Sequence, residues 1–390
     1  MFLYIAILIA IQLGLVYEQS ACPAYSPRTR GVGAFLLVAF IGLVAGLRDM
    51  LGGYDVYVYA NVFENLAANQ EFSLSMFFSL GSQEETAMGQ EPGWILYNKI
   101  VGFFTESKYA FFFFTSMLSF AFLFRHLRKF APYFFFALLI IFCRQFLQSF
   151  IYVRQFLACV TVWFALDFAI RRKLLPFLLV VFVAMNIHIS GFIFLIVYPL
   201  ARWKMPVWIM LGGFVAALAM GLTPGFSALL ESFGGLVENE KAMGYAEGTG
   251  GGAHLFYMIE GLLMAAALMM ARRSIYGIRA APVGRFSGLR KYVPSASVES
   301  NARNICLFNV AFLYVCASLT TLQSPGMMRL IWVFWIGPIC MLPYICEKMD
   351  AGKSAAAFKF IIVLYFISAF WLFAYRFDFG ELLDYKTFLF

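Results

Sequence analysis

Long apolar stretches recur along almost the whole chain, and they constrain its fold more than any other feature. A bilayer core about 30 Å thick needs roughly 20 apolar residues in a helix. Ten stretches approach that length: 1–16, 31–47, 108–124, 131–150, 153–170, 206–222, 254–271, 304–322, 328–346 and 357–375. The chain has 62% apolar and 13% charged residues, a composition that excludes a water-soluble fold. Because these runs lack the alternation of a barrel strand, we expect an all-α, polytopic helical membrane protein.

Three shorter apolar runs add to the ten spans. Residues 174–187 and 189–201 each give only about 20 Å of helix, which is short for an untilted crossing. We expect them to form a thin or re-entrant hairpin with His188 at its tip. Residues 93–104 are expected to lie in the membrane interface. The sequence thus predicts about 10–13 membrane segments in a single integral membrane domain over residues 1–390.

Lysine and arginine gather on one side of the predicted membrane. If the N-terminus starts outside, the inner side has 20 basic and 5 acidic residues, and the outer side has 9 basic and 16 acidic residues. Because cytoplasmic loops carry the positive excess, loop 272–303 is predicted inside, and loops 48–92 and 223–253 outside. We expect a multi-pass protein of a bacterial plasma membrane. The net charge of +8 then reflects topology and anionic membrane lipids, and no nucleic-acid partner is expected.

Four arginines break this charge rule, because they lie at or just inside the outer ends of spans. They are Arg48, Arg144, Arg154 and Arg329. An arginine near the hydrocarbon costs at least about 2.5 kcal/mol, so each needs a partner. Either these side chains snorkel to the interface and pair with nearby carboxylates such as Asp49, or their guanidinium forks bind phosphate oxygens.

Amides accompany two of these arginines. Gln148 follows Arg144 by four residues, which places both on one face of a helix, and Gln155 directly follows Arg154. Two adjacent antiparallel helices would bring these groups to one outer corner. The candidate acids and bases expected on the same side are Asp55, Glu91 and His188. For each of these three, a solvated or structural role is the alternative.

The sequence shows no pattern of a metal or cofactor site. Its seven cysteines lie mostly in apolar runs without CxxC spacing, and its three histidines are far apart. The glycine run 248–252 has no accompanying lysine, so we interpret it as outer loop and not as a phosphate cradle. We therefore expect neither a metal ion nor a cofactor.

Five short motifs follow one another along the expected outer face. They are Arg48 with Gly53, Asp55 and Tyr59; Glu91-Pro92-Gly93 with Asn98; Arg154-Gln155 with Ala158; His188-Ile189-Ser190-Gly191; and Met328-Arg329. In this order they resemble the EpsG-type exopolysaccharide polymerases, which are similar in role to the Wzy O-antigen and capsule polymerases. The first motif departs from the family at Tyr54 and Val56, where threonine and tyrosine are usual.

The resemblance implies a fold that is GT-C-like in the broad sense. It also implies an enzyme that joins oligosaccharide repeat units, carried on undecaprenyl pyrophosphate, into a surface polysaccharide at the outer face of the membrane. The reaction uses no nucleotide sugar, and arginines could stabilise the leaving pyrophosphate without a metal ion. The implied substrate-binding residues are Arg48, Tyr59, Arg144, Gln148, Arg154, Gln155 and Arg329. The implied general-base candidates are Asp55, Glu91 and His188. A chain-length regulator is a further expected partner.

Three other classes of membrane protein remain as alternatives. An O-antigen ligase usually has one very large outer loop, whereas the outer loops here are of moderate size. A membrane acyltransferase would face inward for its coenzyme, whereas the unusual arginines here face outward. A transporter or flippase of lipid-linked sugars also needs arginines that bind pyrophosphate, but it predicts two pseudo-symmetric halves that the sequence does not show.

Overall fold

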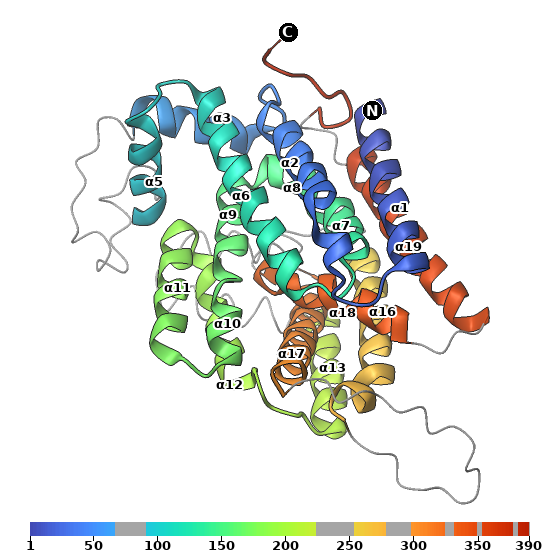
Figure 1. Cartoon of the computed structure of the whole chain (residues 1–390). Helices are drawn as coiled ribbons and strands as arrows, with labels where there is room; N and C mark the ends of the chain where they lie inside the picture. The colour runs from blue at the N-terminus through green and yellow to red at the C-terminus, as the bar shows by residue number, and fades with distance from the viewer. Residues whose placement is uncertain are drawn as a thin grey trace, which may run out of the picture. The chain divides into compact units, whose positions relative to one another are not determined.

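The computed structural model describes residues 1–66, 91–223, 253–277, 298–323, 331–348, 353–376 and 381–389. Helices account for nearly all of the regular structure in these ranges (Figure 1). The only extended pairing among them is an isolated antiparallel bridge between Arg48 and Thr387. The prediction of an all-α fold is confirmed.

Seven helices in the described part of the chain are long and apolar enough to cross a membrane. They are Phe2–Ser20, Pro27–Gly46, Lys108–Phe130, Val153–Ile170, Leu255–Ile275, Asn301–Thr320 and Ala356–Tyr375. Shorter apolar helices accompany them at Phe134–Phe146, Leu174–Ile187, Ile189–Leu200, Val207–Leu222 and Ile331–Glu347. The protein is therefore a multi-pass membrane protein. Three of the ten expected spans, 131–150, 206–222 and 328–346, correspond to shorter helices.

The chain forms two compact units. Unit 1 comprises residues 1–165, 178–192 and 346–390, and unit 2 comprises residues 166–177 and 193–345. The α-helices of unit 1 are α1 (Phe2–Ala21), α2 (Val32–Gly46), α3 (Tyr54–Asn61), α5 (Pro92–Gly102), α6 (Lys108–Phe130), α7 (Phe134–Ile141), α8 (Gln148–Ile151), α9 (Val153–Val162) and α19 (Lys353–Arg376). Unit 1 also contains the 3-10 helix η1 (Pro27–Arg30), the π-helices η2 (Val62–Leu66) and η5 (Phe142–Phe146), and most of α11 (Leu174–Ile187).

The centre of unit 1 is α6, against which α2 and α9 pack, while α1 packs along α7. Helices α2 and α6 approach each other closely at two glycines of α2. A Cβ atom added to Gly42 would lie 3.0 Å from Cβ of Phe120, and one added to Gly46 would lie 3.1 Å from Cα of Phe113. Small residues four positions apart allow two membrane helices to pack backbone to backbone, which explains this pairing.

A buried carboxylate fixes the start of α7. Glu18, near the end of α1, accepts hydrogen bonds from the backbone N–H groups of Phe134, Phe135 and Phe136. These N–H groups belong to the first turn of the helix and have no partner within it. The carboxylate therefore caps α7 from a neighbouring helix, and the favourable interaction with the helix dipole adds to the bond.

The expected span 131–150 is not one continuous α-helix. After α7 the chain continues as the π-helix η5 and the short α8, and Tyr152 (φ −102°, ψ 55°) separates α8 from α9. A π-helix closes its hydrogen bonds five residues apart, so this segment departs from regular α-helical geometry. The predicted common face of Arg144 and Gln148 stays a prediction, and both side chains are buried.

The C-terminal segment 381–389 packs against the end of α2 and the start of α1 (Figure 1). The backbone N–H of Asp49 donates to the carbonyl of Lys386 at 2.9 Å. The hydroxyl of Tyr385 donates to the carbonyl of Val44, also at 2.9 Å. The hydroxyl of Tyr4 donates to the carbonyl of Leu382 at 2.8 Å. This segment therefore covers the junction at which Arg48 is buried.

Unit 2 is built around α17. Its helices are α10 (Ala165–Ile170, whose first residue belongs to unit 1), α12 (Val197–Leu200), α13 (Val207–Leu222), α16 (Ala253–Ile275), α17 (Val298–Thr320), most of α18 (Ile336–Lys348) and half of the 3-10 helix η6 (Ile189–Ile196). Both α13 and α16 pack along α17. Buried Asn309 of α17 donates to the carbonyls of Leu200 and Trp203 at 2.6 and 2.8 Å, which fixes the connection between α12 and α13.

Candidate functional site

The site begins with the first turn of α5. Glu91 precedes the helix, and its carbonyl accepts from the backbone N–H groups of Trp94 and Ile95 at 3.0 and 3.1 Å. Pro92 occupies the first helical position, where its fixed φ and missing N–H are tolerated. The side chain of Glu91 does not cap its own helix. Its carboxylate is therefore available to groups from elsewhere in unit 1.

The Glu91 carboxylate joins two further segments of unit 1. One oxygen, Oε2, forms an ion pair with Nη1 of Arg154, near the start of α9. The other, Oε1, accepts the backbone N–H of Ile189 at 2.9 Å. The side chains of Arg154 and Glu91 are 15% and 19% exposed, so the pair is shielded but still reachable from solvent. Three of the motifs recognised in the sequence thus meet at one carboxylate.

Glycine makes this meeting sterically feasible. A Cβ atom on Gly93 would lie 2.7 Å from the carbonyl oxygen of Asn186, at the end of α11. A Cβ atom on Gly191 would lie 2.8 Å from the backbone nitrogen of Met185. Real Cβ atoms do not approach backbone atoms so closely, because the peptide unit cannot yield as a flexible side chain can. The Glu-Pro-Gly and His-Ile-Ser-Gly motifs therefore each supply a glycine at a point where two backbone segments come into contact.

His188 lies in the break between α11 and η6, as the sequence predicted for the tip of the short hairpin. Its Nδ1 accepts the backbone N–H of Ser190 at 3.1 Å and lies 2.9 Å from the hydroxyl oxygen of Ser190. Because Nδ1 accepts a backbone hydrogen, the neutral ring is assigned its own hydrogen on Nε2. In this geometry the half-buried imidazole presents a hydrogen-bond donor at Nε2.

The helix α3, which carries Asp55 and Tyr59, lies against α5. The ring of Tyr59 meets the ring of Trp94 edge to face, with 5.9 Å between centroids. Asp55 lies in the first turn of α3 and is half-buried. Its carboxylate forms no hydrogen bond or ion pair with the residues that the structure describes. Asp55 therefore differs from Glu91, whose two carboxylate oxygens are both engaged.

Arg48 is placed apart from Glu91 and is 1% exposed. Its Nε donates to the carbonyl of Leu51 at 3.2 Å, its Nη2 to that of Phe150 at 3.1 Å, and its Nη1 to that of Ala45. The guanidinium also lies over the rings of Phe112 and Phe150, at 5.2 and 4.8 Å from their centroids. The arginine thereby joins the end of α2 to α8. Its predicted contact with substrate stays a prediction.

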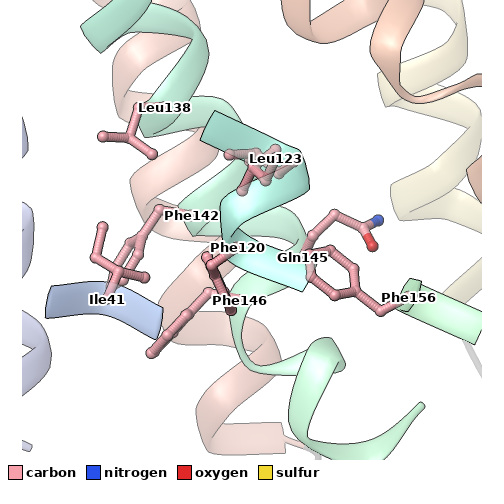
Figure 2. Close-up of a pocket in the computed structure, with 9 residues that line it drawn as sticks. Ile41, Phe120, Leu123, Leu138, Phe142, Gln145, Phe146 and Phe156 are labelled. Carbon is pink, nitrogen blue, oxygen red and sulfur yellow. The ribbon is translucent and has the colours of Figure 1, made fainter. Parts of the chain in front are cut away.

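The remaining polar residues of this region are buried in η5, α8 and α9. Arg144, Gln145, Gln148 and Gln155 are all less than 7% exposed. Gln145 lies among phenylalanine side chains at a small apolar pocket in unit 1 (Figure 2). Within the described residues, Nε2 of Gln145 and Oε1 of Gln148 have no hydrogen-bond partner. Such atoms are rare in folded proteins, so they mark this segment as unusual.

One predicted residue lies outside the described ranges, and one buried carboxylate was not predicted. Arg329 lies outside the described residues, as do most of the predicted loops 48–92, 223–253 and 272–303. Glu260 was not among the predicted site residues; it is buried on α16 of unit 2 and accepts a hydrogen bond from the hydroxyl of Tyr314 at 2.9 Å. A lone carboxylate inside the apolar run 254–271 was the signal that could have identified it.

Comparison with known proteins connects this geometry to a family. The chain matches no curated protein and no solved structure. A model of the EpsG family, in contrast, matches residues 33–387, which is nearly the whole chain. That range contains all five sequence motifs, including the three that meet at the Glu91 carboxylate. The match is too extensive to reflect one local motif, and the chain belongs to the EpsG family.

Proposed function

We propose that this protein polymerises oligosaccharide repeat units carried on undecaprenyl pyrophosphate, at the outer face of a bacterial plasma membrane. Membership of the EpsG family indicates a polysaccharide polymerase-type enzyme, and the apolar helices make it a multi-pass membrane protein. The observation that supports the proposal most is the ion pair of Glu91 and Arg154 beside the His188 loop. It brings a cation and a carboxylate together, in contact with the residue that follows His188.

In the proposed reaction, a hydroxyl of the acceptor unit attacks the anomeric carbon that links the growing glycan to its lipid pyrophosphate. A new glycosidic bond forms, the bond to the pyrophosphate oxygen breaks, and the lipid pyrophosphate leaves with the bonding electrons. The hydroxyl proton passes to a general base. Catalysis then requires a donor group that stabilises the charge developing on the leaving pyrophosphate.

Arg154 is the proposed donor to the pyrophosphate. A guanidinium has five N–H donors in a planar fork, so one side chain can contact a carboxylate and a phosphate together. Glu91 is proposed as a positioning residue, because its contacts with Arg154 and the Ile189 backbone set the direction of the guanidinium. This proposed role needs no metal ion.

Among the three base candidates, the contacts favour Asp55. The Glu91 carboxylate is occupied by Arg154 and the backbone of Ile189. The neutral His188 ring is assigned its hydrogen on Nε2, where it would donate to a substrate oxygen and could not accept a proton. Asp55 has no such engagement among the described residues. We therefore propose Asp55 as general base and His188 as donor to the glycan or pyrophosphate.

The other predicted residues keep proposed roles in binding. Buried Arg144, with Gln148 and Gln155, would contact the substrate from the segment around η5 and α9, and Tyr59 from α3. Arg329 stays a proposal from the sequence alone. Arg48 is the exception, because its donors contact backbone carbonyls; we propose a structural role for it.

Reconstitution with lipid-linked repeat units tests this function. The purified protein should produce a ladder of longer glycans, with or without a metal chelator. Asp55→Asn should lower the rate of lengthening by about 100-fold, as loss of a general base does. Asp384→Asn is the matched control, because that carboxylate is exposed and lies in the C-terminal segment. Movement of lipid-linked units across the membrane without lengthening would instead identify a transporter and overturn the proposal.

A further inference from the structure

Unit 2 contains a cavity of about 810 Å³, and the charged residues among its described lining are cationic. Arg171 and Lys173 line it from the turn between α10 and α11, and Arg202 lines it from the connection between α12 and α13. Asn301 of α17 adds an amide, and the lining residues that the structure describes include no acidic side chain. Clustered cations repel one another, so this arrangement favours an anionic ligand.

Hydrogen bonds fix the backbone segments that carry the cationic groups, whose side chains are exposed. Arg172 has a left-handed backbone (φ 58°), and its Nη1 donates to the carbonyl of Tyr198 at 2.7 Å. Nε of Arg202 donates to the carbonyl of Ile170 at 2.8 Å. The first contact fixes the turn that carries Arg171 and Lys173, and the second joins Arg202 to that turn. The cavity is thus organised before a ligand binds, which lowers the entropic cost of binding.

The surroundings of the cavity indicate its depth in the membrane. Leu174 and Leu175 begin α11 directly after the basic turn, and both are exposed. Trp203, next to Arg202, is exposed as well. Tryptophan is enriched at the membrane–water interface, and exposed leucines on a membrane protein contact lipid chains. Basic side chains beside such residues lie where lipid phosphates are found.

We propose that this cavity binds the phosphate groups of an anionic membrane lipid, whose acyl chains lie along the exposed leucines of α11. Basic pockets between membrane helices are known to hold acidic lipid headgroups. The volume is large for a single phosphate ion and falls in the range of organic ligand sites. A headgroup with two phosphates, as in cardiolipin, matches three separate cations better than one phosphate does. This inference does not depend on the polymerase activity.

Lipid titration of the full-length protein in a neutral detergent tests the site. Cardiolipin, phosphatidylcholine and inorganic phosphate are added separately, and bound ligand and the thermal midpoint are measured by native mass spectrometry and thermal unfolding. Cardiolipin should bind and raise the midpoint, whereas phosphatidylcholine and inorganic phosphate at the same concentration should not. Lys173→Gln should weaken cardiolipin binding about fivefold, as removal of one basic contact near the membrane surface does.

Arg128→Gln is the matched control, because Arg128 is exposed near the end of α6 in unit 1 and does not line the cavity. It should leave cardiolipin binding unchanged. Arg171→Gln is a second test variant, so the result does not depend on one substitution. Equal losses in Arg128→Gln and Lys173→Gln would overturn the proposal, since binding would then follow total charge. Equal stabilisation by inorganic phosphate would overturn the assignment to a lipid.

Discussion

Two arginines of unit 1 that the sequence presents as equivalent have very different surroundings. Arg48 is buried, and three backbone carbonyls and two phenylalanine rings surround its guanidinium. Arg154 is partly exposed and pairs with Glu91, a carboxylate that is itself partly exposed. Both lie near the end of a predicted span and both begin a family-like motif. The two arginines differ in what their guanidinium donors contact: backbone carbonyls around Arg48, and a partly exposed carboxylate beside Arg154.

This difference teaches how a membrane protein makes use of a costly residue. A buried arginine whose hydrogens all go to carbonyls stabilises a junction between helices, because those carbonyls would otherwise lack donors. An arginine beside a carboxylate at a partly exposed corner can exchange or share that contact with an anionic ligand. We therefore expect substitution of Arg48 to act on stability and substitution of Arg154 to act on catalysis.

The largest effect is expected for Arg154. Arg154→Ala should lower the rate of glycan lengthening by about 1000-fold, the loss typical when one donor to a developing negative charge is removed. Its thermal midpoint should change little, because partly exposed ion pairs contribute about 1 kcal/mol or less. Arg154→Lys keeps the charge but lacks the planar fork, so it should recover little activity. Near-normal polymer from Arg154→Ala would remove the distinction between the two arginines.

The next effect concerns the stability of Arg48→Ala. Loss of the guanidinium leaves three buried carbonyls without donors, at roughly 1 kcal/mol each, so the free energy of unfolding should fall by about 3 kcal/mol. Denaturation in mixed micelles with increasing SDS measures this change. Arg48→Lys should restore part of the stability, since an ammonium still donates to carbonyls. A fully stable Arg48→Ala protein without activity would place Arg48 with Arg154 as a substrate-binding residue.

A smaller effect is expected when a substitution outside the ion pair displaces Glu91 relative to Arg154. In Gly93→Ala, the new Cβ would lie 2.7 Å from the carbonyl oxygen of Asn186, so α5 must shift and take Glu91 with it. We expect about a tenfold loss in lengthening rate, since small displacements in an active site are costly. Gly33→Ala is the control, because no atom lies within 4 Å of its added Cβ. Equal activities of these two variants would show that Glu91 does not position Arg154.

The fold was largely predictable, because hydrophobic length alone identifies membrane helices. The short helices on both sides of His188 were also expected from their 13 or 14 residues. The interruption of the span 131–150 was not predicted. A π-helix leaves the residue types of a sequence unchanged and adds only to the width of one turn, so no hydropathy pattern reports it. The capping of α7 by Glu18 was missed because the two groups are distant in sequence.

The site was predictable only in part. The motifs containing Glu91, Arg154 and His188 were each found in the sequence, but their meeting at one carboxylate depends on tertiary packing that Gly93 and Gly191 permit. The structural surroundings of Arg48 could not be read from its position at the end of a span. Its hydrogen-bond partners are backbone carbonyls, which every residue type has, so the sequence does not show which of them bind the guanidinium. The sequence showed the residues of the cationic cavity in unit 2 only as separate basic segments, with no sign that they line one cavity.

Residues 381–389 also determine when unit 1 can be completed during biosynthesis. The hydroxyl of Tyr4 and the carbonyl of Leu382 are separated by 378 positions, and Thr387 pairs with Arg48. The ribosome must therefore synthesise nearly the whole chain before α1 and α2 can contact this segment. Until then α1 and α2 lack their hydrogen bonds to the C-terminal segment. We expect pulse-labelled chains halted before residue 381 to be degraded faster than the full-length chain.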